Sequence, residues 1–178
     1  MEANTFDFEA HLRKVREQTQ GVTEVTEDRI ALAFAERYGD QFRYYHHHGS
    51  WFVWNGQWWA KEETKLAFHY AREIAREHNI MNKASIAKTS TAAGVERHAQ
   101  ADRAFAVTSE KWDRDPFLLG TQVGTVDLRS GKLRPARQED YITKTTAVSP
   151  APPDTEPALW LRFLQDATGG DAGLMRFL

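Results

Sequence analysis

The chain has 178 residues, of which 41% are hydrophobic and 12% aromatic, a composition typical of a folded protein with one full core or two small ones. Its formal net charge of −2 at pH 7 gives the whole molecule no strongly basic footprint, and the absence of cysteine excludes disulfides, thiolate metal sites and a cysteine nucleophile. No apolar stretch is long enough to cross a membrane, and the N-terminus lacks the apolar core of an export signal, so we expect a cytoplasmic protein.

Residues 1–25 predict an N-terminal arm or a linker helix, because Phe8, Leu12 and Val15 have only a weak helical spacing. The first 28 residues carry seven acids against three bases, a balance typical of solvated surface. A firmer helix is expected next. Thr26 can cap it, acids fill its first turn, and Gly39 can end it.

The chain then changes to aromatic and β-branched runs, "FRYYHHH", "WFVW" and "QWWAKE", between residues 42 and 62. Gly49-Ser50 separates the first two runs, and Asn55-Gly56, a dipeptide suited to a type I′ turn, separates the last two. The pattern predicts a three-stranded antiparallel meander. A helix follows from residue 62 to Asn79, and residues 85–107 are expected to continue helically in two pieces broken around Gly94.

The segment "DPFLLGTQVGTVDLRSGKLRPA" predicts a second, shorter hairpin, with "TVDL" and "KLRP" on either side of Arg129-Ser130-Gly131. From Arg129 to Lys144 five basic residues face two acids, a run that indicates either solvated surface or contact with phosphate. The expected fold class is α+β: mostly helical, with the aromatic meander and the second hairpin. Its main domain would span residues 26–149.

Residues 150–178 form a proline connector and two helices in this interpretation. Pro157 suits the first turn of one helix, behind Asp154 and Thr155 as candidate caps. Asp171 is a good cap for a second helix that has only seven further residues and no closing cap. Because so short a helix is not stable alone, we expect the polypeptide to continue beyond Leu178.

The three consecutive histidines, His46 to His48, are the one candidate metal site. Alternate strand residues share a face, so His46 and His48 could hold one ion, but only with a third ligand from elsewhere, and ordinary surface histidines are the simpler interpretation. No P-loop, H-E-x-x-H or G-x-S-x-G motif is present. The sequence therefore predicts no catalytic residue and no metal site.

The aromatic hairpin has two interpretations. The rings can pack the two faces of a sheet, or rings on one face can remain exposed and stack on single-stranded bases or on sugars. For contact with single-stranded DNA, the candidate residues are rings and cations of the two hairpins: Arg43, Trp54, Trp59, Lys61, Arg129, Lys132 and Arg134. The cations would contact phosphates and the rings would stack on bases.

The order of these segments resembles a known family. "WNGQWW", "DPFLLGTQVGTVDLRSGKLRP", "DYITKTTAV" and "WLRFLQDATGGDAGLMRFL" are similar to phage and plasmid primase-helicases, in the domain named after the N-terminal domain of poxvirus primase. The resemblance covers roughly residues 27–178. Asn55 stands where the family usually has Asp, and Ser130 where it more often has Thr.

The resemblance implies a non-catalytic connecting domain that positions or assembles a helicase of superfamily three on single-stranded DNA. The helicase would follow in the same chain. ATP and Mg²⁺ are expected there and no cofactor here, and the full protein is expected to be a hexamer without a membrane partner. The alternative is a Trp-rich module for carbohydrates or small molecules, unrelated to replication.

Overall fold

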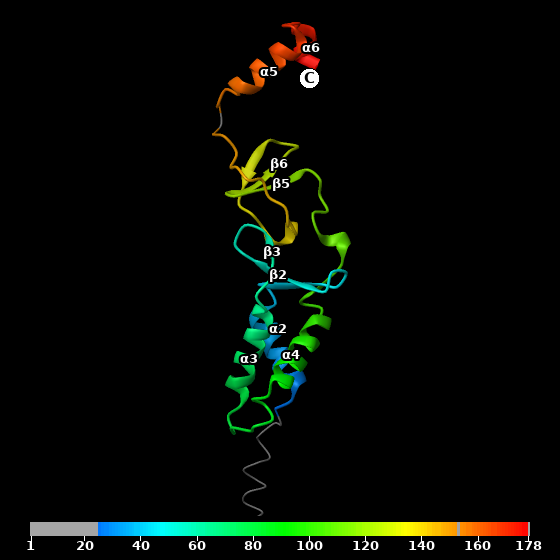
Figure 1. The fold of residues 1–178 in the computed structure, drawn as a ribbon, viewed down its shortest axis with the longest axis vertical. Coiled ribbons are helices and arrows are strands. Elements are labelled where there is room, and N and C mark those ends of the chain that lie inside the picture. Colours follow the sequence, from blue (N-terminus) through cyan, green and yellow to red (C-terminus); the bar gives the residue numbers. More distant parts are fainter. Residues whose placement is uncertain (1–24, 153, 178) are drawn as a thin grey trace, which may run out of the picture.

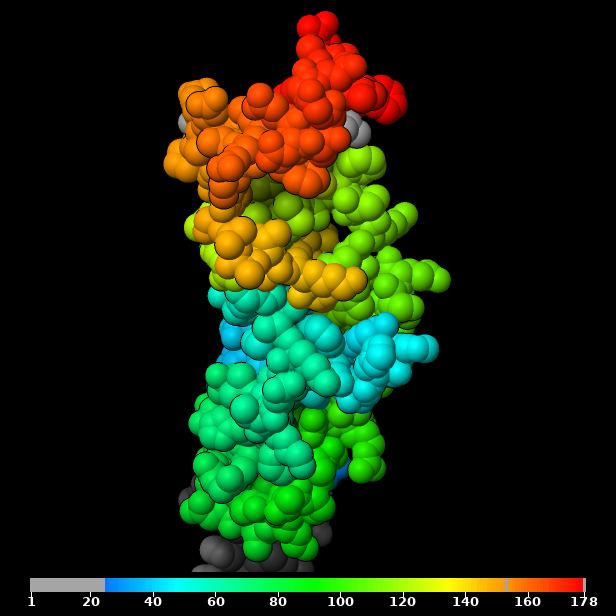
Figure 2. Space-filling view, turned by 45° about the horizontal axis from the view of Figure 1, so that its top comes forward, coloured from blue at the N-terminus to red at the C-terminus, as the bar shows by residue number. Residues whose placement is uncertain are grey.

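The computed structural model describes residues 25–152 and 154–177. The expected α+β fold is confirmed: along an elongated molecule lie, in order, three helices, a four-stranded sheet, a three-stranded sheet and two further helices (Figure 1). The space-filling view shows the same succession of layers (Figure 2). The predicted arm at residues 1–25 lies almost wholly outside the described residues, and the proposed domain boundaries stay predictions.

The helical layer contains α2 (Glu27–Tyr38), α3 (Leu66–His78) and α4 (Thr89–Ala101). The predicted cap of α2 is confirmed, because the amide of Arg29 donates to Thr26 Oγ1 at 3.2 Å. The start of α3 has no such cap: Lys65 has a left-handed backbone, and the Glu62 carboxylate instead accepts the amide of Leu66 at 3.0 Å. The predicted break at Gly94 is wrong, because α4 runs through it without interruption.

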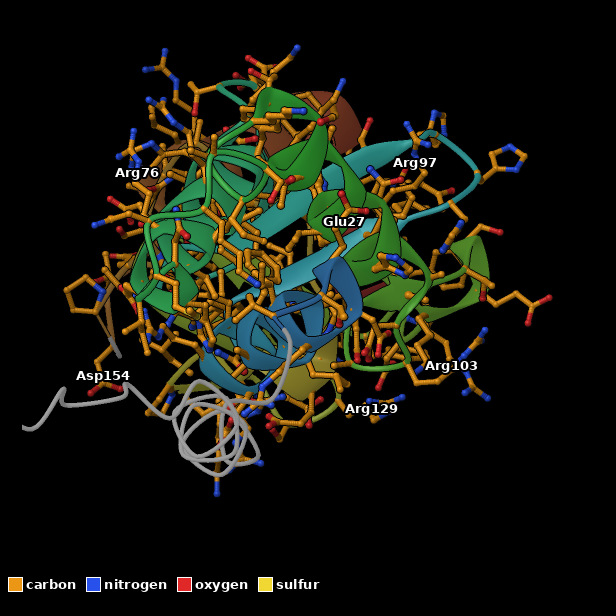
Figure 3. The ribbon with its side chains drawn as sticks, turned by 90° about the horizontal axis from the view of Figure 1, so that it is seen from below. Glu27, Arg76, Arg97, Arg103, Arg129 and Asp154 are labelled. Carbon is orange, nitrogen blue, oxygen red and sulfur yellow. The ribbon has the colours of Figure 1, made fainter. Side chains whose placement is uncertain are left out.

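Gly94 lies where α4 crosses α2, and a Cβ there would lie 2.3 Å from Glu27 Oε2. Figure 3 shows Glu27 between these two helices. The Glu27 side chain is exposed and flexible, so it can move aside, whereas glycine in the middle of a helix costs about 0.8–1.0 kcal/mol relative to alanine. We expect Gly94→Ala to raise the free energy of unfolding by up to that amount in urea titrations.

The Glu27→Ala/Gly94→Ala variant serves as the control for this prediction. If Glu27 moves aside freely, the double variant gains no more from the alanine at residue 94 than the single variant does. A loss of stability in Gly94→Ala that Glu27→Ala restores would contradict the expectation.

The four-stranded sheet has the order β3-β2-β1-β4, with β1 (Phe42–Tyr45), β2 (Ser50–Trp54) and β3 (Trp59–Lys61) as the antiparallel meander that the sequence predicts. The fourth strand, β4 (Ala106–Val107), runs parallel to β1 and was expected to be helical. The helix ends earlier, at Ala101, where Asp102 takes up an extended backbone.

Both turns of the meander are longer than the dipeptides Gly49-Ser50 and Asn55-Gly56 predict. Tyr45 pairs with Ser50, and Trp54 pairs with Trp59, so each loop has four residues. The predicted type I′ turn is wrong, because Gly56 has a positive φ of 95° but Asn55 does not. The Asn55 side chain instead closes the loop by accepting the amides of residues 57 and 58, each at 2.9 Å.

One face of this sheet and the three helices enclose the main core. Phe42 and Trp51 from the sheet are buried against Phe34 of α2 and Ile74 of α3. Phe105, just before β4, completes the cluster, with its ring centroid 5.4 Å from that of Phe34. The helical face of the sheet therefore accounts for three of the eight Phe, Tyr and Trp side chains of residues 42–61: Phe42, Tyr44 and Trp51.

The second sheet has three antiparallel strands, β5 (Leu118–Thr121), β6 (Gly124–Asp127) and β7 (Lys132–Arg134). The hairpin of β6 and β7 was predicted, and β5 extends it. Leu119, Val126 and Leu133 are paired across the three strands and therefore lie on one face, where Leu119 and Leu133 are exposed. Of two short 3₁₀ helices, η1 (Ser109–Lys111) lies in the segment that connects the two sheets, and η2 (Gln138–Asp140) lies in the segment between β7 and α5.

The final helices are α5 (Ala158–Thr168) and α6 (Ala172–Phe177). Asp171 caps α6 as predicted, accepting the amides of residues 173 and 174 at 2.8 and 3.0 Å. The predicted caps of α5, Asp154 and Thr155, are wrong, because Pro157 occupies that position and no side chain caps the helix. Among the described residues, no helix combines the length and apolar character that a membrane span needs.

Candidate nucleic-acid interface

The second face of the four-stranded sheet was the candidate stacking surface, and it is covered. Trp112, from the segment after η1, packs on Phe52 with ring centroids 4.9 Å apart. The ring of Tyr141, which follows η2, is nearly parallel to that of Trp59, with centroids 6.2 Å apart, and its centroid lies 5.5 Å from that of Trp112. Most of the remaining rings of the meander therefore join a second aromatic cluster, between the sheet and the segments that contain η1 and η2.

Trp59 is the clearest case among the predicted stacking residues. Its side chain has no exposed surface, and its indole Nε1 donates to the carbonyl of Gln138 at 3.0 Å. A ring without exposed surface cannot stack on a base in this conformation, so Trp59 is a core residue. Trp54 packs on it at 5.6 Å and is half-buried.

Arg43 also makes its contacts within the protein. Its guanidinium lies over the Trp59 ring, 4.7 Å from the centroid, and donates to the carbonyls of Gly39 and Phe42. Its Nε lies 3.5 Å from the hydroxyl of Tyr141. Arg43 therefore joins β1 to the segment that covers it. Lys61, at the end of β3, is exposed instead.

The motif "DPFLLGTQVGTVDLRSG" holds the second sheet together. Arg129 donates to both carboxylate oxygens of Asp115, at 2.8 and 3.0 Å, and its guanidinium lies 4.4 Å from the centroid of the Phe117 ring. Asp127 accepts the amide of Arg129 at 2.9 Å. The Arg129 side chain stays about half exposed, and Figure 3 shows it at the edge of the molecule.

Arg134 and Lys132 of β7 differ in their surroundings. Arg134 forms a two-point ion pair with Asp140, both bonds at 2.8 Å, and the two side chains are only 25% and 12% exposed. This pair attaches η2 to the sheet. Lys132 is exposed and forms no ion pair within the described part of the chain. Contact of these seven residues with DNA stays a prediction.

The Arg129 ion pair has a consequence that can be measured. Hydrogen bonds from Arg129, and next the amide of Phe117, hold the pKa of the Asp115 carboxyl below its usual value of 3.8. A depressed pKa means that the pair stabilises the fold at pH values above 3.8 and that this contribution disappears as pH falls through the folded-state pKa.

We therefore expect Arg129→Met to raise the pKa of Asp115 toward 3.8 in an NMR titration of the carboxyl carbons. Lys132→Met, which removes a neighbouring charge without touching the pair, should leave that pKa where it is in the natural protein. An unchanged pKa in Arg129→Met would show that the pair does not form in solution.

The three histidines do not lie in a strand. His46, His47 and His48 occupy the four-residue turn between β1 and β2, so the alternation on which the metal interpretation depended is wrong. His46 Nε2 lies 2.8 Å from the carbonyl of Gln100 and attaches the turn to α4. Within residues 25–152 and 154–177, no three potential ligands are grouped to hold a metal ion.

Sequence reasoning missed Lys111, Arg114 and Tyr141, which line a cleft beside the second sheet together with Arg129. Their positions along the chain gave no periodic signal, because they lie in connecting segments. The only available indication was the local density of basic residues around the second hairpin.

These features define a small α+β scaffold in which most of the expected binding residues are structural. The sequence profile of the family described as "D5 N terminal like" matches residues 31–169, more than half of the chain, and the chain belongs to this family. The domain is found in phage and plasmid primase-helicases, N-terminal to the helicase, and is generally non-catalytic. No curated protein gives a significant match. The family resemblance inferred from the sequence motifs is thereby confirmed.

Proposed function

We propose that the chain is a DNA-handling module that contacts single-stranded DNA and positions a helicase domain following it in the same polypeptide. ATP and Mg²⁺ would act in that helicase, and assembly would give a hexamer. The observation that carries the proposal is the family match over residues 31–169, because this domain occurs next to helicases in primase-helicases.

The charged surface supports a phosphate contact of limited size. Lys61 and Lys132 are exposed and form no ion pair among the described residues, and Arg129 keeps part of its guanidinium accessible. Arg43 and Arg134 are engaged inside the molecule. A few free cations on a chain of net charge −2 favour weak, salt-dependent binding that other parts of a full protein would reinforce.

The alternative, a Trp-rich module for carbohydrates or small molecules, is not supported by the structure of the sheet. It needed flat rings on an open sheet face, whereas Trp51 and Trp59 are buried and Trp112 covers the second face. The ring that is most exposed among the described tryptophans, Trp160, lies on α5, away from the sheet, and is 52% exposed.

The test is the binding of a fluorescein-labelled oligothymidine, followed by fluorescence anisotropy at several salt concentrations. Lys61→Ala/Lys132→Ala should weaken binding and reduce the slope of log K against log salt by about 1.4, since each phosphate contact to a single strand contributes about 0.7. The matched control is Arg72→Ala/Arg76→Ala, which removes two exposed cations of α3 (Arg76 is labelled in Figure 3). Equal losses in both variants would show that only overall charge matters and would contradict the proposed contact.

A further inference from the structure

A cleft of about 630 Å³ lies between the segment that connects the two sheets and the segment that follows β7. Lys111 and Arg114 line one side, Glu139 and Tyr141 line the other, and Arg129 reaches it from the second sheet. The volume is within the range of about 300–1,000 Å³ that is usual for sites binding small ligands. It is therefore large enough for a nucleotide.

Most acids of the cleft are already neutralised by partners. Asp115 is bound at both oxygens by Arg129, and Asp140 is bound at both oxygens by Arg134. Lys111 and Arg114 are exposed and, within the described residues, form no ion pair. The cleft thus offers two available cations close to one remaining acid, Glu139, a balance that favours an anionic ligand.

An aromatic ring lies in the same cleft. Tyr141 is half-buried, and Lys111 Nζ is 5.4 Å from the centroid of its ring. A cation beside a flat ring is the combination that single-strand binding proteins use, because the cation contacts the phosphate and the ring stacks on the base.

The walls of the cleft are fastened to each other. Asp113 and Tyr141 both have left-handed backbones, with φ of 47° and 51°, a conformation that few residues other than glycine adopt. The amide of Asp113 donates to the Tyr141 carbonyl at 3.1 Å. The Asp113 carboxylate accepts the Thr143 amide at 2.8 Å and its hydroxyl at 2.6 Å. The backbone that carries Lys111 and Arg114 is therefore fixed to the opposite wall before any ligand arrives, which lowers the ordering cost of binding.

We infer that this cleft receives a nucleotide of single-stranded DNA, with the phosphate near Lys111 and Arg114 and the base against Tyr141. The inference rests on the proposed function and gives it a specific site, one that differs from the exposed lysines of β3 and β7.

Two experiments on the 178-residue chain test the inference. In the first, Lys111→Ala/Arg114→Ala should weaken oligothymidine binding and lower the salt slope by about 1.4, with Arg72→Ala/Arg76→Ala as the control. Circular dichroism should give both variants the unfolding midpoint of the natural protein. Full binding by Lys111→Ala/Arg114→Ala, together with weakened binding by Lys61→Ala/Lys132→Ala, would overturn the cleft and leave the proposed function intact. If the natural chain did not bind oligothymidine, both the cleft and the proposed function would be contradicted.

The second experiment needs no variant. An oligonucleotide containing 5-iodouracil is irradiated in complex with the natural chain, and the crosslinked peptide is identified by mass spectrometry. We expect the crosslink in the peptide that contains Tyr141. A crosslink confined to the peptides of Trp54 or Trp160 would overturn the inference, even if the first experiment gave weakened binding.

Discussion

Trp59→Ala should cost about 3–5 kcal/mol of unfolding free energy, the usual range for removing a buried tryptophan or phenylalanine side chain. Trp59 has no exposed surface, packs between Trp54 and Tyr141, and donates to the Gln138 carbonyl. Its removal opens a cavity and leaves that carbonyl without its partner. Since the total free energy of unfolding of a small protein is about 5–15 kcal/mol, the variant should unfold at a much lower urea concentration.

Trp160→Ala is the matched control, because it removes the same ring from a position that is 52% exposed on α5. We expect it to change stability by no more than about 0.5 kcal/mol. Unfolding should be followed by far-ultraviolet circular dichroism, which does not depend on the tryptophan that is removed. If Trp59→Ala lost as little stability as Trp160→Ala, the covered face of the sheet would not exist in solution.

The second large effect is expected at Gly124, at the start of β6. Its φ is 145°, and a Cβ there would lie 2.3 Å from the carbonyl oxygen of Arg134. A residue other than glycine in such a conformation costs about 1–3 kcal/mol. The overlap with backbone comes in addition, because no flexible side chain can move aside. Gly124→Ala should therefore disrupt the second sheet.

Gly131→Ala separates the two causes. Gly131 also has a positive φ, 67°, but nothing lies within 4 Å of where its Cβ would be. It should lose only the conformational part, about 1–2 kcal/mol. Protection of β5–β7 amides from hydrogen exchange should fall much more in Gly124→Ala. Equal losses in the two variants would contradict the close approach of Gly124 to Arg134.

The strands of the meander and four of the five described helices could be predicted because their signals are local. Alternating aromatic residues and caps such as Thr26 and Asp171 depend only on near neighbours. β4 could not be predicted, since two residues following a helical pattern carry no strand signal of their own. The turn between β2 and β3 was predicted wrongly for a different reason. Asn55 closes a four-residue loop through its side chain, and the preference of the Asn-Gly dipeptide for type I′ turns does not specify that geometry.

The candidate site was harder to predict than the fold, because its contacts join residues that are distant in the sequence. Trp112 and Tyr141 cover the meander, whose last strand, β3, ends at Lys61, some fifty residues before Trp112. Arg134 is engaged by Asp140 through a local return of the chain, but nothing in the spacing distinguishes it from Lys132, which stays exposed. Residue type alone therefore could not tell which cations are engaged inside the molecule and which are exposed.

The proposed function requires that the chain bind single-stranded DNA through a small number of exposed cations. The most direct measurement is the affinity of the natural chain for oligothymidine as a function of salt concentration. With Lys111, Arg114, Lys61 and Lys132 contacting phosphates, log K should fall linearly with log salt with a slope of about −2.8, or about −0.7 for each contact. Affinity that does not change with salt, or no detectable binding at low salt, would contradict the proposed contact with DNA.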